Sequence, residues 1–286
     1  MTDMFLNKKI VFLFLLFIFL WHGLSAPLNS KQPAQKLFSF GIMADIQYAD
    51  KDTKGKRYYR QSIENLKKCV SDLNKQELAF TIQLGDIIDG NETAEQTAID
   101  VKQVMDEYNQ LIMPAYHAIG NHCMRAGAGI LKEQLGLEKF YYDFKAPESE
   151  KWRFIVLDGN DAGYGVLGEN QLKWLGSRLD VARQQNELVT VFNHFPLVEA
   201  AAAKHRMKEP KPVVDLIENS DCVVAYVAGH DHAGGYAFHK GIHHLTLHGM
   251  VEAPVENAYA IVDVFPDKLV IHGFGKELSR ELVLPE

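Results

Sequence analysis

The sequence predicts an α/β fold in which two mixed β-sheets pack face to face and helices cover the outer faces, a four-layer α/β/β/α sandwich. Strand-like apolar runs alternate with helical patterns in the earlier part of the chain, and a run of strands follows later. This order of elements is typical of sheets layered between helices. We find no internal repeat and no second domain.

The earlier part of the chain alternates strands with helices. The predicted elements are, in order, a strand at 37–44, a helix at 57–76, a central strand ending before Gly85, a helix at 93–111, a strand from Pro114 and a helix at 127–136. The apolar side chains of the second helix that we expect to face inward are Ile99, Val101, Val104 and Met105.

The later part of the chain is richer in strands. We predict a hairpin from 141–144 and 152–157, a helix at 170–183, a strand ending before Asn193, a helix-favouring run of four alanines at 200–203, a helix at 213–218, a strand at 223–227, and strands at 242–247, 259–265 and 269–272.

The first 26 residues have the pattern of a secretory signal peptide. Lys8 and Lys9 precede an apolar run, and the small residue Ala26 suits cleavage. The run is shorter than the ~20 apolar residues of a spanning helix, so an N-terminal membrane anchor is the weaker alternative. We expect a secreted or periplasmic protein without a membrane span after cleavage, with a linker at 27–36 and a domain at 37–286.

Charge and cysteine content exclude several classes of function. The formal net charge is −7, so we do not expect general binding to nucleic acid or to anionic membranes. An anionic substrate would need a local positive charge, and a metal site supplies one. The cysteines Cys69, Cys123 and Cys222 are too few and too widely spaced for a disulfide scaffold. No protein partner is evident from the sequence.

Five strand-like runs end in carboxylate, amide or imidazole side chains. Ligands and metals on α/β sheets bind at the carboxyl ends of strands. These strand ends therefore predict one metal site. The residues at the five strand ends are Asp45 and Gln47, Asp86, Asn121 and His122, His194, and His230 and His232.

The chemistry of these groups favours transition metals. Carboxylate oxygens combined with imidazole nitrogens suit Mn²⁺, Fe²⁺ or Zn²⁺, whereas calcium prefers oxygen ligands alone. Asp86 follows the central strand and is placed to bridge two ions. The neutral amide of Asn121 leaves the site net positive for phosphate, and the adjacent His122 is a candidate proton donor to a leaving group. His230 and His232, two apart in an extended segment, are expected to project to the same side.

The order of these motifs resembles the calcineurin-like metallophosphoesterase family, whose pattern is D-x-H, G-D-x-x-D, G-N-H-E/D, H and G-H-x-H. The matching segments are 45–47, 85–89, 120–123, 194 and 229–232. A single block would be weak evidence, whereas five blocks in family order are specific. The resemblance implies the metallophosphoesterase fold, and a hydroxide between metals ~3.5–4 Å apart would attack phosphorus in line.

The resemblance also implies a role for each residue. One metal would be held by Asp45, Gln47, Asp86 and His232. The other would be held by Asp86, Asn121, His194 and His230. His122 would protonate or stabilise the departing oxygen.

Two positions depart from the family pattern. Gln47 replaces the usual histidine, and its amide oxygen makes the first metal site harder, which favours Mn²⁺ or Mg²⁺. Cys123 replaces the acidic residue after His122, which removes an expected orienting partner. We expect Cys123 to be a neighbour of the site without binding metal.

The D-x-Q variant, together with 37–41, 57–60 and 228–236, is similar to the Mn-dependent ADP-ribose/CDP-alcohol diphosphatase subfamily. This implies a dinuclear hydrolase that cleaves the pyrophosphate of nucleotide-linked small molecules. Two divalent ions are implied, with Mn²⁺ favoured and Fe²⁺, Zn²⁺ or Mg²⁺ as alternatives. The alternative functions are a broad phosphomonoesterase or phosphodiesterase on the same site, and a catalytically silent metal-binding module.

Three residues are weaker candidates for substrate contacts. Arg57 and Arg60 follow the Asp45 loop and could hold a second phosphate, although the first turn of a helix is the stronger expectation. Tyr236 flanks the last motif and could stack on a base, although packing is the stronger expectation. We expect Asp231 to be solvated. The histidines expected to be surface or structural residues are His117, His205, His239, His243, His244, His248 and His272.

Overall fold

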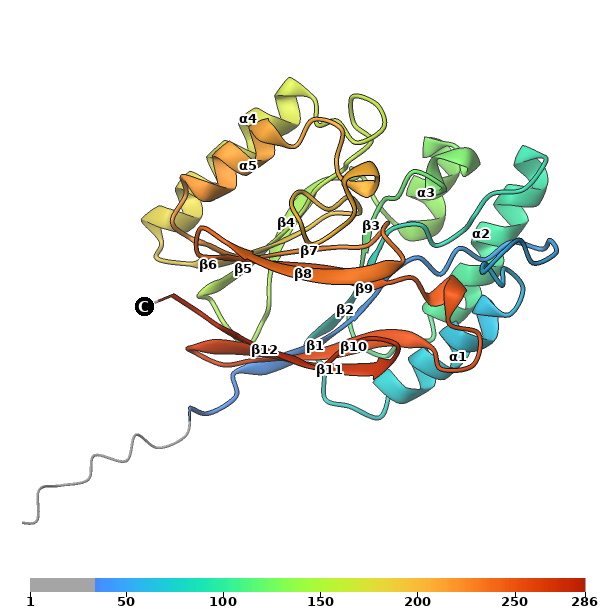
Figure 1. Cartoon of the computed structure of the whole chain (residues 1–286), viewed down its shortest axis with the longest axis horizontal. Helices are drawn as coiled ribbons and strands as arrows, with labels where there is room; N and C mark the ends of the chain where they lie inside the picture. The colour runs from blue at the N-terminus through green and yellow to red at the C-terminus, as the bar shows by residue number, and fades with distance from the viewer. Residues whose placement is uncertain (1–33, 286) are drawn as a thin grey trace, which may run out of the picture. The chain divides into compact units, whose positions relative to one another are not determined.

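Residues 34–285, which the computed structural model describes, form two six-stranded β-sheets with α-helices on their outer faces (Figure 1). The predicted signal peptide and most of the predicted linker lie outside the described residues. Within the described part, no helix has both the length and the apolar composition needed to cross a membrane.

The first sheet is mixed and has the order β12-β11-β10-β1-β2-β3. Its strands are β1 (Phe38–Met43), β2 (Phe80–Leu84), β3 (Ala115–Ala118), β10 (Ala258–Val264), β11 (Lys268–Gly275) and β12 (Arg280–Val283). β1, β2 and β3 run parallel, whereas β10 pairs with β1 antiparallel. The carboxyl ends of β1, β2 and β3 therefore meet at one edge of this sheet.

The second sheet is also mixed and has the order β4-β5-β6-β7-β9-β8. Its strands are β4 (Tyr142–Lys145), β5 (Trp152–Val156), β6 (Leu188–Phe192), β7 (Val223–Ala228), β8 (Ala233–His239) and β9 (Ile242–His248). β5, β6, β7 and β9 run parallel, and the edge strands β4 and β8 are antiparallel to their neighbours.

The helices divide between the two outer faces (Figure 1). α1 (Ser62–Leu73), α2 (Ala94–Tyr108) and α3 (Ala128–Leu135) pack on the first sheet, and α4 (Glu169–Gln184) and α5 (Lys211–Glu218) pack on the second. Short 3₁₀ helices occur at Cys123–Ala126 (η1), Ala203–His205 (η2) and Met250–Glu252 (η3). The predicted four-layer fold class is confirmed.

Aromatic side chains fill the space between the sheets. Phe40 of β1 stacks on Phe80 of β2 with ring centroids 4.7 Å apart, and Phe80 meets Phe154 of β5 at the same distance. Phe154 in turn stacks on Phe192 of β6 at 5.8 Å. These residues point inward because side chains alternate between the faces of a strand. The cluster joins both sheets directly behind the strand ends that carry the candidate site.

Two helix predictions need correction. The first helix begins at Ser62 and not at 57, because Lys54 and Arg57 exchange backbone hydrogen bonds of 3.2 and 3.1 Å that hold a turn before it. Ile99 was predicted to face inward but is 56% exposed. It precedes Val101 by two residues, roughly 200° around the helix, so it lies on the opposite face.

The alanine run and the edge strands also differ from prediction. Residues 200–203 form no α-helix, and η2 begins only at Ala203. β8 and β12 were not predicted as strands. β8 contains Gly234 and Gly235, whose low strand propensity hides the pattern, and its pairing with β9 stabilises it.

The aromatic cluster yields a prediction about stability. Phe154 is fully buried and contacts rings from both sheets. Phe154→Ala should lower the free energy of unfolding by about 3–5 kcal/mol, because a large cavity would remain. Chemical denaturation measures this change. The control Ile99→Ala, at an exposed position, should stay within about 0.5 kcal/mol of the parent protein, and equal effects of both substitutions would contradict the assignment of the core.

Candidate metal centre

The structure brings all eight predicted site residues to one place, where strand ends of both sheets meet. Six of them line a cavity of about 680 Å³, and Asp45 and His194 are fully buried beside it. The six lining residues are Gln47, Asp86, Asn121, His122, His230 and His232. Packing of the two sheets therefore unites side chains that are up to 187 residues apart in the chain.

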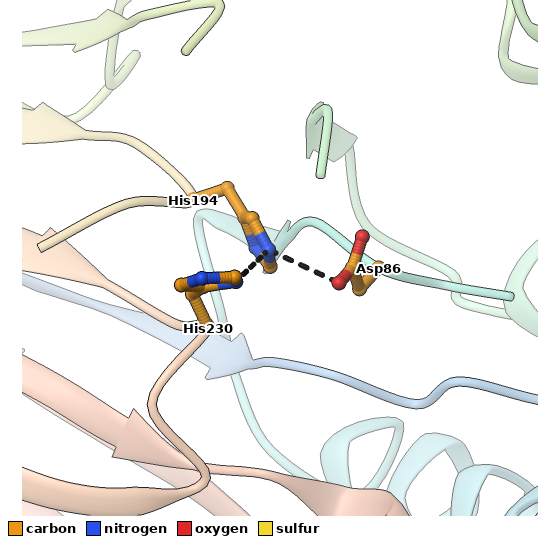
Figure 2. Close-up of side chains that lie close together, drawn as sticks. All are labelled: Asp86, His194 and His230. Atoms are coloured by element: carbon orange, nitrogen blue, oxygen red, sulfur yellow. Dashed lines mark hydrogen bonds and ion pairs between the residues drawn. The ribbon is translucent and has the colours of Figure 1, made fainter. Parts of the chain in front are cut away.

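Asp86, His194 and His230 form the centre of the cluster (Figure 2). His194 Nε2 lies 3.1 Å from Asp86 Oδ2 and 3.1 Å from His230 Nδ1. His194 Nδ1 lies 2.9 Å from the carbonyl oxygen of Leu84. Since a carbonyl can only accept, Nδ1 carries a proton, and Nε2 is the ring nitrogen that faces Asp86 and His230. The three ligand atoms lie within 4.8 Å of one another, which is a spacing that suits a metal ion.

A second group of candidate ligands adjoins the first. His232 Nε2 lies 3.3 Å from Asp45 Oδ1, and its Nδ1 lies 3.0 Å from Glu252 Oε1. The amide nitrogen of Gln47 lies 3.3 Å from Asp86 Oδ2. Asp86 Oδ2 is thus shared between the two groups. A carboxylate on the far nitrogen of a histidine, as Glu252 provides, is a common support for a metal ligand.

Three buried oxygens of the site form no hydrogen bond within the described residues. They are Asp45 Oδ1, Gln47 Oε1 and Asn121 Oδ1. A buried polar atom without a partner costs free energy, so native structures rarely leave one unsatisfied. A divalent cation would satisfy these oxygens. Their combination with imidazole nitrogens fits a metal such as Mn²⁺.

The backbone around these ligands is strained. Asp45, Gln47, Asp86 and His230 have φ values of 52°, 42°, 49° and 67°, in the left-handed region that non-glycine residues avoid. The segment around His230 is therefore not extended, contrary to prediction. Strain of this kind costs about 1–3 kcal/mol per residue and clusters at functional sites.

Two glycines make room for the buried carboxylates. A β-carbon at Gly120 would lie 2.1 Å from Asp86 Oδ1, and one at Gly229 would lie 2.6 Å from Asp45 Oδ2. Without these side chains, the two aspartates can accept backbone hydrogen bonds. Asp86 Oδ1 accepts from the amide of His122 at 2.7 Å, and Asp45 Oδ2 accepts from the amide of His230 at 2.8 Å.

The protonation states of Asp86 and His230 suit cation binding. Burial opposes the charged form of Asp86, yet the neighbouring His194 lowers the pKa of this carboxyl below its usual value. Burial, aided by His194, lowers the pKa of His230 to about 3. At neutral pH the carboxylate is therefore ionised and the His230 ring is neutral. These are the forms in which both residues bind metals. At His194 and His232, burial opposes the charged form, but the neighbouring carboxylates of Asp86 and Asp45 raise the pKa, so a bound cation would displace a proton from each ring.

His122 has an orienting partner that the sequence did not reveal. Its Nδ1 lies 2.8 Å from the carbonyl oxygen and 3.2 Å from a carboxylate oxygen of Asp89, and Lys51 forms an ion pair with Asp89. Asp89 thus supplies the support that was expected to be missing when Cys123 replaced an acidic residue. Burial raises the pKa of Cys123 to about 12, so its thiol stays protonated, as expected for a neighbour that does not bind metal.

Several residues at the cavity were not predicted to be there. The hydroxyl of Tyr164 lies 2.8 Å from His230 Nε2. His205, expected at the surface or in a structural role, lines the cavity and pairs with Asp231 at 2.9 Å. Asp231 was predicted to be solvated but is buried, because it also accepts a hydrogen bond from the amide of Ala202. Among these residues, only Tyr164 had a feature in the sequence that could indicate a site, namely its glycine-rich segment.

The three candidate substrate contacts lie in different places, and only one of them is at the cavity. Arg57 lines the cavity. Arg60 lies outside the cavity lining, because Asp50 and Asp52 both pair with it at 2.6 Å. The hydroxyl of Tyr236 bonds His243 on the neighbouring strand at 2.9 Å, so Tyr236 serves packing and is absent from the cavity lining.

Comparison with known proteins agrees with this geometry. The family model described as calcineurin-like phosphoesterase matches residues 38–234. Manganese-dependent ADP-ribose/CDP-alcohol diphosphatases from Oryza sativa and Arabidopsis thaliana are 32% and 33% identical to this chain. These alignments cover 89% and 86% of this chain and 95% and 97% of the two relatives.

A solved structure with a similar fold comes from Danio rerio. It is the crystal structure of a dimetal phosphatase, and it matches with a TM-score of 0.80 at 25% identity. The match covers 88% of this chain and all of the other. The similarity therefore includes both sheets and the strand ends between which the candidate metal centre lies.

Metal binding should stabilise the protein against heat. A ligand at 100 times its dissociation constant adds about 2.7 kcal/mol, so Mn²⁺ should raise the unfolding temperature by about 5–10 °C. Asp86→Asn should abolish this rise, because the shared carboxylate is lost. Differential scanning calorimetry with and without Mn²⁺ measures the shift in unfolding temperature for the parent protein and for the variant. Asp106→Asn, on the exposed face of α2, is the matched control, and Mn²⁺ should raise its unfolding temperature as much as that of the parent protein. An equal rise for Asp86→Asn would contradict the assignment of Asp86 as a metal ligand.

Proposed function

Because the chain belongs to the calcineurin-like phosphoesterase family, we propose that this metal-dependent phosphoester hydrolase cleaves the pyrophosphate of nucleotide-linked small molecules, with ADP-ribose and CDP-alcohols as substrates. The observation that carries the proposal is the convergence of all eight site residues around one cavity, with Gln47 among them. The relatives named for this activity match over nearly the whole chain, which supports the same substrate class here.

The proposal includes two divalent ions, with Mn²⁺ as the physiological metal. Asp45, Gln47, Asp86 and His232 would hold one ion, and Asp86, Asn121, His194 and His230 the other. Support comes from Asp86 Oδ2, which lies 3.3 Å from the Gln47 amide nitrogen and 3.1 Å from His194 Nε2 and so stands between the two groups. When bound, such ions neutralise phosphate charge and activate water.

The protein side chains supply the remaining chemistry. His122 is held by Asp89 through Nδ1, which leaves Nε2 as the ring nitrogen available to the cavity. In this position it can donate a proton to the oxygen that leaves phosphorus. Arg57 on the cavity wall can bind a phosphate oxygen, since a guanidinium matches the geometry of an anionic oxygen pair.

A comparison of substrates tests the proposed activity. The metal-stripped protein, reloaded with Mn²⁺, Mg²⁺, Zn²⁺ or Fe²⁺, should hydrolyse ADP-ribose and CDP-choline in preference to p-nitrophenyl phosphate and a cyclic nucleotide, and Mn²⁺ should support the highest rate. Asp86→Asn should lower kcat by about 1,000-fold or more, because a shared metal ligand contributes several kcal/mol and each 1.36 kcal/mol is a factor of ten.

The control for this experiment is Asp106→Asn, which should retain the parent rate. A preference for p-nitrophenyl phosphate would favour the broad phosphomonoesterase. Metal binding without turnover of any substrate would favour the silent metal-binding module.

We also propose that the protein is exported. The support is the charged and apolar pattern of the first 26 residues. The protein isolated from its native host should begin after Ala26 and fractionate outside the cytoplasm, as N-terminal sequencing and cell fractionation measure. An intact N-terminus in the membrane fraction would instead indicate an N-terminal anchor.

A further inference from the structure

A second cavity of about 680 Å³ lies beside the candidate metal centre. Arg57 and His122 line both cavities, so the second cavity adjoins the first at the residue placed to donate a proton. Its wall also includes Asp89 and Lys51, the residues that orient His122. Nothing in the proposed chemistry of the metal centre accounts for this second cavity.

The second cavity carries excess positive charge. Its lining has four cations, Lys51, Lys54, Arg57 and Arg125, against three acidic side chains. Asp89 forms ion pairs with both Lys51 and Arg57, and Asp52 pairs with Arg60, which is outside the lining. No acidic side chain of the described residues forms an ion pair with Lys54 or Arg125. In a chain with a net charge of −7, this local excess of cations would attract an anion.

Arg125 is held close to His122 by the backbone. Its amide donates to the carbonyl oxygen of His122 at 3.1 Å, in the short turn that follows the third motif. Its side chain lies across Gly90, where a β-carbon would come within 2.3 Å of Arg125 Cδ. Gly90 has a φ of +81°, which favours glycine for a second reason. The side chain of Arg125 is therefore held at the wall of the second cavity.

We propose that the second cavity binds the leaving half of the substrate, a phosphate monoester such as ribose 5-phosphate, through Arg125 and Lys54. This inference rests on the proposed function. In the reaction, the oxygen of water bonds to the scissile phosphorus, and the bond to the bridging oxygen breaks with its electron pair. His122 gives its proton to that oxygen, and water releases a proton to solvent. The two products are phosphate monoesters.

The geometry explains why the cations lie beyond His122. An in-line displacement sends the leaving group away from the attacking water, past the group that protonates it. When a pyrophosphate is cleaved, the leaving group gains negative charge, so a cation on that side stabilises the transition state more than the bound substrate. A leaving group without phosphate gains little from Arg125. The second cavity therefore selects pyrophosphates over simple esters.

The test compares two substrates that share one nucleotide. ADP-ribose has a phosphorylated leaving group, and the p-nitrophenyl ester of AMP has a leaving group without phosphate. Arg125→Gln should lower kcat/KM for ADP-ribose by about tenfold or more and for the ester by no more than about twofold, because one charge-assisted hydrogen bond is lost. Lys68→Gln is the matched control, since it removes an exposed charge on α1 that forms no ion pair within residues 34–285. Arg125→Lys should restore part of the loss.

A binding measurement accompanies the kinetics. Calorimetric titration of ribose 5-phosphate into the Mn²⁺-loaded protein should show weaker binding to Arg125→Gln than to Lys68→Gln. Suppose that the parent protein cleaves ADP-ribose while Arg125→Gln lowers kcat/KM equally for both substrates, or for neither of them. In that case the second cavity is not the leaving-group site, and the proposed function stands. If the parent protein cleaves no pyrophosphate, both proposals fail.

Discussion

The buried carboxylate of Asp86 is the constraint on which the rest of the site depends. It is fully buried just after β2, which was predicted to be the central strand but lies next to the edge strand β3 of the first sheet. An isolated negative charge would be unstable there. The surroundings compensate with an amide hydrogen bond from His122 and the imidazole of His194, while the left-handed backbone of Asp86 adds strain. Gly120 has to lack a side chain for this arrangement to form. A cation placed at the shared oxygen would complete the compensation, which links the stability of the centre to its chemistry.

Each of the two sheets contributes only part of the candidate metal centre. Asp45 and Asp86 come from the first sheet, and His194 and His230 come from the second. Stacking of Phe40, Phe80, Phe154 and Phe192 holds the two sheets together behind them. Close packing of large rings resists small relative movements, so it fixes the distances between ligands from the two sheets.

His122 connects the metal centre with the second cavity. Asp89 orients its ring and is itself paired with Lys51, so a chain of polar contacts leads from the candidate proton donor into the basic lining. The same turn that carries His122 carries Arg125. Protonation and charge stabilisation of a leaving group would therefore be provided by adjacent residues, without any movement of the fold.

The sequence by itself determined the order of the main strands and helices and the identity of the candidate ligands, because strand ends such as Gly85-Asp86 and Gly229-His230 are local patterns of apolar runs followed by polar side chains. It could not place Ile99, the edge strand β8 or Asp231, whose environments depend on helix rotation, pairing with β9 and contact with His205. Arg57 and Arg60 look alike in sequence, yet only Arg57 lines the cavity, since Asp50 and Asp52 hold Arg60 elsewhere. Tertiary structure alone decided where Glu252, Tyr164 and Arg125 lie relative to the site, because contacts between distant segments leave no periodic signal in the chain.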